Sequence, residues 1–122
     1  MATILVVEDN PANMTLVVFL LESAGYTVFS ATDAEAGLTL ARDRQPDLIL
    51  MDIQLPAMDG LQATQLLKNA DATRAIPVIA LTALAMKGDE ERIRAAGCDG
   101  YIAKPIRYRD FLATVAAQLR PV

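Results

Sequence analysis

The sequence contains no histidine and a single cysteine, Cys98. Without histidine, the chain lacks the commonest general base, the usual zinc ligand and any means of carrying phosphate as phosphohistidine. One cysteine excludes an internal disulfide and a multi-thiolate metal site, so we expect Cys98 to be a small, half-buried apolar residue. If the protein handles phosphate, the phosphoryl group must come from another molecule.

The sequence also lacks a long hydrophobic run and an excess of basic residues. Its longest apolar stretch, Leu16 to Leu21, is far shorter than the roughly 20 residues of a membrane-spanning helix, and residues 1–3 lack the basic start of a signal peptide. The formal net charge is -4, so there is no positive field to hold nucleic acid or anionic lipid. We therefore expect a cytoplasmic protein with no direct nucleic-acid or membrane contact.

The chain is long enough for one ordinary domain. Its 122 residues are 53% hydrophobic and 21% charged, a balance typical of a folded protein with one core. We expect a single domain over residues 1–122. Because the chain ends at Val122, just after the last predicted helix, we expect no effector domain and output through protein contacts, unless the chain is a fragment of a longer protein.

Short apolar runs alternate with amphipathic segments along the chain. The runs predict strands over Thr3 to Val7, Thr27 to Ser30, Asp47 to Met51, Pro77 to Leu81 and Tyr101 to Ala103. The segments predict helices over Pro11 to Ala24, Ala34 to Arg44, Gly60 to Asn69, Lys87 to Ala96 and Tyr108 to Leu119. Because continuous Val, Ile and Leu strands are buried on both faces, the pattern predicts an α/β fold: a doubly wound, five-stranded parallel sheet with helices on both faces.

Polar residues follow four of the predicted strands. Glu8 and Asp9 follow the first, Asp52 the third, Thr82 the fourth and Lys104 the fifth. Ligands of such sheets bind beyond the carboxyl ends of the strands, where the strand order reverses. Each residue alone has an ordinary explanation as a helix cap or a solvated charge. Together they predict a functional site at this edge.

The acidic residues at this edge favour a magnesium site. Asn10 and Pro11 have the types expected at the start of a helix, so one neighbouring carboxylate can be explained by helix capping, but two cannot. Carboxylate oxygens with room for water and phosphate suit Mg²⁺. A cation would also keep Asp52 deprotonated near other acids, as a nucleophile that forms an aspartyl-phosphate requires.

Three further residues are suited to holding a phosphoryl group. Thr82 offers a hydroxyl donor and Lys104 a mobile positive charge. Ala83 has a small side chain that leaves its backbone N–H accessible to a phosphoryl oxygen. Pro105 predicts a rigid turn directly after Lys104, and an X-Pro bond is where a cis peptide occurs.

Several separated motifs resemble the receiver domains of two-component response regulators, from Thr3 to about Leu119. These motifs are Val6-Val7-Glu8-Asp9-Asn10, residues 47–56, Met58-Asp59-Gly60, Ile79-Ala80-Leu81-Thr82-Ala83 and residues 97–105. Residues 52–56 and 86–94 are most similar to cell-cycle regulators that consist of one such domain. The resemblance implies the flavodoxin-like receiver fold and a phosphoacceptor switch rather than an enzyme with turnover.

The resemblance also implies a role for each residue of the site. Asp52 would be the phosphoacceptor, with phosphate held by Lys104, Thr82 and the Ala83 amide. Mg²⁺ would be bound by Asp9, Asp52 and the backbone carbonyl of Gln54, with assistance from Glu8, which stands where the family often has aspartate. Tyr101 would be the aromatic switch that moves as Thr82 is drawn to the phosphate, unless it is an ordinary half-buried tyrosine.

Partners are also implied. A histidine kinase or histidine phosphotransfer protein would donate phosphate, and a separate protein would be the downstream target. Phe19 faces away from the apolar stripe of the first predicted helix, so it is either incidentally exposed or part of the donor docking face; the stripe comprises Met14, Val17, Leu20, Leu21 and Ala24. By family analogy, a second surface would involve Arg92, Tyr101, Arg107, Tyr108 and Phe111.

Two alternatives share parts of this pattern. A magnesium-dependent phosphohydrolase also uses an aspartate nucleophile after a strand, but its usual second acid is replaced by Gln54. A flavin-binding electron carrier would need a phosphate-cradling loop where Glu8 and Asp9 stand. Within the receiver interpretation, Gln54 and the apolar Leu84 occupy the positions that tune hydrolytic water, so we expect a slowly decaying aspartyl-phosphate.

Overall fold

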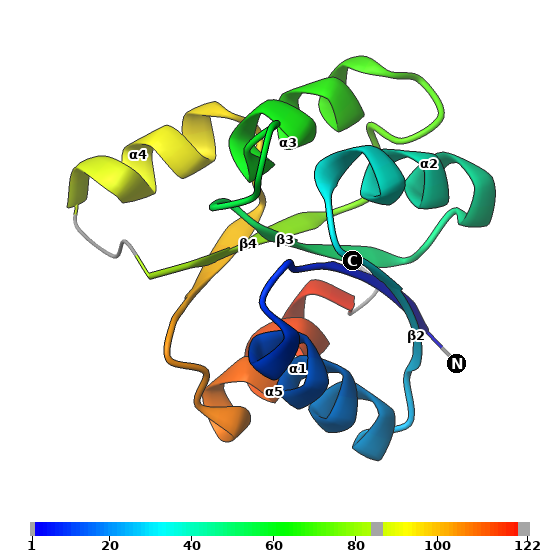
Figure 1. Ribbon diagram of the computed structural model, residues 1–122, viewed down its shortest axis with the longest axis vertical. Coiled ribbons are helices and arrows are strands. Elements are labelled where there is room, and N and C mark those ends of the chain that lie inside the picture. The colour runs from blue at the N-terminus through cyan, green and yellow to red at the C-terminus, as the bar shows by residue number, and fades with distance from the viewer. Residues whose placement is uncertain (1, 84–86, 120–122) are drawn as a thin grey trace.

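The computed structural model describes residues 2–83 and 87–119, so Leu84 and Met86 lie outside the described residues. Strands and helices alternate along the chain (Figure 1). The strands are β1 (Thr3–Val7), β2 (Thr27–Ala31), β3 (Leu48–Asp52), β4 (Val78–Thr82) and β5 (Gly100–Ala103). The helices are α1 (Pro11–Ser23), α2 (Ala34–Arg44), α3 (Gly60–Asn69), α4 (Lys87–Ala95) and α5 (Tyr108–Leu119).

All neighbouring strands are parallel, in the order β2-β1-β3-β4-β5. In the sheet, β2 lies on one side of β1, and the chain then crosses to the other side of β1 to form β3. The strand order therefore reverses between β1 and β3, which places a crevice beyond their carboxyl ends.

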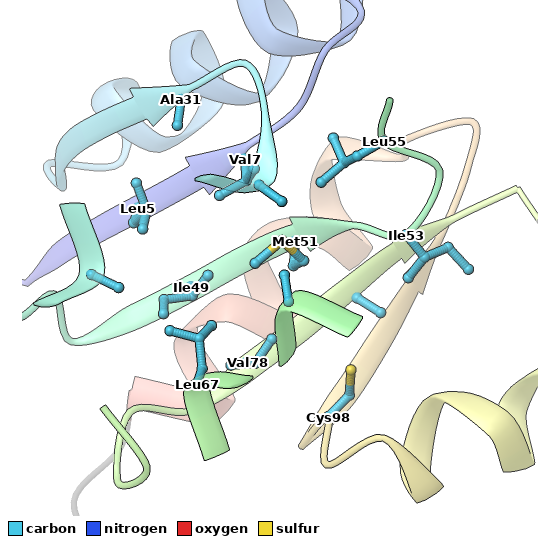
Figure 2. Packing of buried hydrophobic residues seen from close by; sticks show 14 of the residues in the cluster. Leu5, Val7, Ala31, Ile49, Met51, Ile53, Leu55, Leu67, Val78 and Cys98 are labelled. Atoms are coloured by element: carbon cyan, nitrogen blue, oxygen red, sulfur yellow. The ribbon is translucent and has the colours of Figure 1, made fainter. Parts of the chain in front are cut away.

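The sheet is covered on both faces, as the alternation of strands and helices predicts. Figure 1 shows α1 and α5 on one face and α2, α3 and α4 on the other. Alternate residues of each central strand point to opposite faces. In β1, Ile4 and Val6 pack with Phe111 on the α1/α5 side, whereas Leu5 and Val7 pack with Leu67 on the other side. Figure 2 shows the second of these cores.

Local sequence signals explain where several helices begin. Asn10 caps α1 by accepting a hydrogen bond from the Asn13 N–H, and Pro11 occupies the first helical position, where a missing N–H is not costly. At α3, Asp59 and Gln62 form a reciprocal capping box. These caps hold the first turns of two helices that border the carboxyl edge of the sheet.

The predicted fold is confirmed, with small differences at the ends of elements. Asp52 and Thr82 are the last residues of β3 and β4 rather than the first residues after them. Ala24, predicted to lie on the buried stripe of α1, instead caps the helix and is exposed. The Lys104–Pro105 peptide is cis. None of the helices in the described ranges combines the length and apolar character needed to cross a membrane.

Candidate phosphorylation site

Most of the predicted site residues gather around an open hollow of about 510 Å³ at the carboxyl edge of the sheet. The hollow lies beyond β1 and β3, at the reversal of strand order. Its lining comes from segments far apart in the sequence: Glu8, Asp9, Asn10, Pro11, Asn13, Asp52, Gln54, Ala83 and Lys104. The sequence reasoning missed Asn13, since its position one turn into α1 carries no distinctive signal.

Asp52 is held at the end of β3 with both carboxylate oxygens engaged. Only 3% of the residue is exposed. Its Oδ1 accepts a hydrogen bond of 2.9 Å from the Gln54 N–H, and its Oδ2 accepts one of 3.2 Å from Lys104 Nζ. The Gln54 N–H and the Lys104 ammonium together therefore fix the orientation of the Asp52 carboxylate, which positions one of its oxygens to react at the hollow.

Lys104 links the carboxylate of Glu8, which directly follows β1, to that of Asp52, which ends β3. Its Nζ lies 2.9 Å from Glu8 Oε1 and 3.2 Å from Asp52 Oδ2. Lys104 directly follows β5, and its N–H donates a 2.7 Å hydrogen bond to the Thr82 carbonyl at the end of β4. The backbone pairing of β4 and β5 thus determines where the ammonium reaches.

Burial and mutual contact shift the pKa values of this pair. Burial, followed by the contact with Asp52, raises the pKa of Glu8 to about 7, although Lys104 and the Asn10 N–H lower it. For Lys104, burial by itself would lower the pKa, but the Glu8 and Asp52 carboxylates outweigh burial and raise it. The ammonium of Lys104 therefore stays charged at neutral pH, whereas Glu8 exchanges protons there in the metal-free protein.

The donor atoms around the hollow fit a hard divalent cation. Glu8, Asp9 and Asp52 each offer a carboxylate oxygen, and these oxygens lie within 4.8 Å of one another. Glu8 Oε1 is buried and, although close to Lys104, accepts no hydrogen bond of good geometry among the described residues. Three clustered carboxylates match the preference of Mg²⁺ for oxygen ligands.

The other predicted residues have different relations to the hollow. Gln54 and Ala83 line it, whereas Thr82 is fully buried at the end of β4 and does not line it. Tyr101 is half-buried on β5, where it packs against the core and lines a second hollow beside α5. The structure thus brings the acids, Gln54, Ala83 and Lys104 around the hollow. Thr82 is buried at the same carboxyl end of the sheet, next to Ala83, whereas Tyr101 lies near the start of β5.

Phe19 is exposed, as the helical spacing predicts. It is 65% exposed, and Leu16, one turn earlier on α1, is 39% exposed. Asn13, one further turn back, lines the hollow. Positions three apart share a face of a helix, so this line of residues leads from the hollow to the two exposed apolar side chains. The sequence reasoning identified Phe19 and missed Leu16, the first residue of a continuous apolar run.

Comparison with known proteins identifies the class to which this fold and site belong. Residues 4–116 match the family model described as the response regulator receiver domain. The chain belongs to this family, and it is a phosphoacceptor switch of two-component signalling. The match favours this function over a phosphohydrolase or a flavin carrier.

Within the family, the chain is similar to the polar-differentiation response regulator DivK. It is 51% identical to DivK of Brucella anthropi over 96% of this chain and 95% of that protein. It is 50% identical to DivK of Brucella ovis with the same coverage. The predicted similarity to single-domain regulators of this kind is confirmed.

Solved structures support the same fold. The receiver domain of the sensor histidine kinase PA1611 from Pseudomonas aeruginosa, described with a magnesium ion coordinated in its active-site cleft, is 37% identical, with a TM-score of 0.90 and 97% coverage of both chains. The chemotaxis response regulator CheY4 of Vibrio cholerae is 27% identical, with a TM-score of 0.93 and coverage of 98% of this chain and 99% of that chain.

Proposed function

We propose that Asp52 accepts a phosphoryl group from a phosphohistidine of another protein. The observation that best supports this proposal is the position of the Asp52 carboxylate. Asp52 ends β3, is nearly buried, and lies between the Lys104 ammonium and two further acids. An Asp52 oxygen attacks phosphorus, the O–P bond forms, and the P–N bond of the donor breaks. The imidazole nitrogen leaves with the electron pair. Because none of the 122 residues is histidine, the donor is a histidine kinase or phosphotransfer protein.

In this proposal, Asp9, Asp52 and the Gln54 carbonyl hold Mg²⁺, with Glu8 supporting it. The PA1611 receiver domain, which has a magnesium ion coordinated in its active-site cleft, supports the assignment. When bound, Mg²⁺ neutralises charge on the phosphoryl oxygens. Lys104, the Thr82 hydroxyl and the Ala83 N–H supply the remaining contacts to those oxygens.

We assign the exposed apolar strip of α1, Leu16 and Phe19, to docking of the phosphodonor. The strip is supported by its continuity with Asn13, which lines the hollow. A donor that covers it brings its histidine to the edge where Asp52 lies. Replacement of Phe19 by alanine should slow transfer from the cognate donor and leave phosphorylation by a small donor unchanged.

Output is assigned to the surface formed by α4, β5 and α5. Tyr101 moves when Thr82 engages phosphate, and a downstream protein in the cytoplasm binds one of the two states. The affinity difference between the states sets how far such a partner shifts their populations. The chain also assists loss of its own phosphate, slowly, because Gln54 and Leu84 do not position water well. An aspartyl-phosphate that decays within seconds would contradict this last point.

The test of the central proposal is phosphorylation by acetyl phosphate with Mg²⁺, followed by intact mass. The wild type should gain one phosphoryl group, and Asp52→Asn should gain none. Asp47→Asn is a matched control, because Asp47 precedes β3 as Asp52 ends it, and it contacts Thr3 rather than the hollow. No gain by the wild type, or an equal gain by Asp52→Asn, would overturn the assignment.

A further inference from the structure

Strand β5, which leads to Lys104, is short and lies at an edge of the sheet. Its four residues pair with β4 alone, and Ile102 is the one residue among them that is buried. A buried apolar face is what fixes the register of a strand, so the side chains of β5 specify its register weakly. The position of Lys104 therefore depends on the backbone contacts at the two ends of β5.

Asp99 anchors the amino end of β5 to β4. Its N–H donates a 2.7 Å hydrogen bond to the Val78 carbonyl, and its Oδ2 accepts one of 2.8 Å from the Val78 N–H. Val78 is the first residue of β4, and Asp99 directly precedes β5. Asp99 thus binds both backbone groups of Val78, which sets the register that continues with Ile79 opposite Gly100.

Lys68, in the last turn of α3, holds the Asp99 carboxylate in this position. Its Nζ donates hydrogen bonds of 3.0 Å to Asp99 Oδ2 and 2.8 Å to the Ile76 carbonyl, which lies just before β4. Gly97 permits this close approach, because it has a φ of +105° and a Cβ there would lie 2.9 Å from Lys68 Cγ. We call Lys68 and Asp99 the amino-end clamp.

The clamp is one of two long-range ion-pair systems, and the two lie at opposite ends of β5. Lys68 and Asp99 are 31 residues apart, and Lys104 joins Glu8 to Asp52. The other ion pairs of the described residues connect positions no more than four apart. One long-range system directly precedes β5 and the other directly follows it. The four-residue strand is therefore held by charged side chains at both ends.

We propose that Lys68 and Asp99 are positioning residues for phosphorylation, because they hold β5 in the register that places Lys104 between Glu8 and Asp52. The proposal rests on the proposed function, in which the Lys104 ammonium contacts the phosphoryl oxygens. A slip of one residue would move Lys104 by about 3.3 Å and turn its side chain to the other face of the sheet. Such a slip breaks contacts of 2.9 and 3.2 Å between Lys104 Nζ and the two carboxylates.

The test is the rate of phosphorylation by acetyl phosphate at saturating Mg²⁺, followed by intact mass. Lys68→Met and Asp99→Ala should each slow the reaction about fivefold or more. Asp99→Asn should react faster than Asp99→Ala, because its amide oxygen can still accept the hydrogen bond from the Val78 N–H. Combined with Lys104→Met, the clamp substitutions should cause no further slowing, since residues that act through Lys104 then have no ammonium to position.

Mg²⁺ affinity separates positioning from general damage to the site. The clamp lies at the amino edge of the sheet, whereas the clustered carboxylates lie at the carboxyl edge. Mg²⁺ should therefore bind both clamp variants at least as tightly as wild type. Lys68→Met keeps both hydrogen bonds between Asp99 and Val78, so it should remain folded and carries the test if Asp99→Ala does not fold.

Asp47→Ala is the matched control. Asp47 directly precedes β3, its N–H donates a 2.8 Å hydrogen bond to the Thr3 carbonyl, and its Oδ2 accepts one of 2.8 Å from the Thr3 N–H. The arrangement matches that of Asp99, but β3 is a central strand that pairs on both sides and is buried along its whole length. Its register does not depend on this anchor, so Asp47→Ala should react at the wild-type rate.

Four results would overturn the proposal. They are wild-type rates in both Lys68→Met and Asp99→Ala, equal slowing by these substitutions with and without Lys104→Met, weaker Mg²⁺ binding in the clamp variants, and an Asp99→Asn rate no higher than that of Asp99→Ala. Equal slowing by Asp47→Ala would also contradict it, because any loosened strand would then have the same effect.

Failure of the proposed function gives a different pattern of results. Wild type that gains no phosphoryl group contradicts the role of Asp52. Lys104→Met that reacts as fast as wild type contradicts the role of Lys104. If wild type reacts faster than Lys104→Met but no faster than the two clamp variants, the clamp proposal alone is contradicted.

Discussion

Gly60 packs directly against the backbone of Asp52. A Cβ on residue 60 would overlap the Asp52 carbonyl oxygen and lie 2.7 Å from Ile53 Cα. The Gly60 N–H also donates a 3.1 Å hydrogen bond to the Ile53 carbonyl. Because these neighbours are backbone atoms, they cannot move without moving the end of β3. The first residue of α3 therefore fixes the position of the phosphoacceptor.

Replacement of Gly60 by alanine should damage both stability and metal binding. We expect the free energy of unfolding to fall by about 3 kcal/mol, the upper end of overpacking costs, since backbone cannot rotate away as a side chain can. Mg²⁺ affinity should fall as well, because the displaced loop carries Gln54. Urea unfolding and a magnesium titration measure the two effects.

Two other glycines separate these effects. At Gly37, a Cβ would lie 2.7 Å from Val7 Cγ2, so Gly37→Ala should destabilise the fold without a specific loss of Mg²⁺ affinity. At Gly88, no described atom beyond its chain neighbours and its own helix backbone lies within 4 Å of the added Cβ, so Gly88→Ala should be neutral or stabilising, since alanine favours a helix. Equal loss of Mg²⁺ affinity in Gly37→Ala and Gly60→Ala would contradict the positioning role.

The stability of the metal-free protein should depend on the protonation of Glu8. Its folded-state pKa of about 7 lies above the ordinary value of 4.5. Between these values the folded protein binds more protons than the unfolded chain, so the free energy of unfolding falls as pH rises. The contribution is fully present below about pH 4.5 and lost above about pH 7. Urea unfolding across this range measures it.

Glu8→Gln should remove this part of the pH dependence, because glutamine does not titrate. Excess Mg²⁺ should also reduce the decline in wild type, since a ligand that binds the folded state stabilises it and carboxylates bind it when deprotonated. The same slope with pH in wild type and Glu8→Gln would show that Glu8 titrates normally.

Replacement of Lys104 by methionine should strengthen Mg²⁺ binding but slow phosphorylation. The ammonium competes electrostatically with Mg²⁺ for Glu8 and Asp52, so its removal should tighten Mg²⁺ binding. Phosphorylation by acetyl phosphate should slow, because a positive charge that meets the phosphoryl oxygens is lost. Calorimetry and intact mass test the two directions. Weaker Mg²⁺ binding in Lys104→Met would contradict the competition.

Replacement by alanine should affect the free energy of unfolding differently at Phe19 and at Phe111. Phe111 is fully buried on α5, so Phe111→Ala should lower the free energy of unfolding by about 3–5 kcal/mol. Phe19 is 65% exposed, so its replacement should change stability by no more than about 0.5 kcal/mol. Urea unfolding tests both. A large loss of stability in Phe19→Ala would make its effect on phosphotransfer uninterpretable as docking.

The fold was predictable because its periodic signals are strong. Strands of continuous Val, Ile and Leu, with capped helices between them, left little choice of architecture. The ends of the strands were harder to predict, because backbone pairing with the neighbouring strand determines where a strand ends. Asp52 is paired with Leu81, and Thr82 with Ala103, so both extend strands that the apolar pattern had ended one residue earlier.

Parts of the site depend on contacts that sequence spacing does not encode. The residue types indicated that Lys104 would approach the acids, but not that its Nζ would lie between Glu8 and Asp52. Ala24 was assigned to the buried stripe by periodicity, yet the helix ends there and exposes it. The stacking of Arg109 on Tyr108 joins adjacent residues, but it depends on side-chain rotamers.

The bridge made by Lys104 has a consequence for the order in which the chain is synthesised. Glu8, Asp9 and Asp52 emerge from the ribosome well before residue 104, because domains are made from the N-terminus. Until β5 joins β4, three carboxylates must share one edge of the growing sheet without their ammonium. A chain at that stage lacks the ammonium that lies between Glu8 and Asp52 in the folded protein.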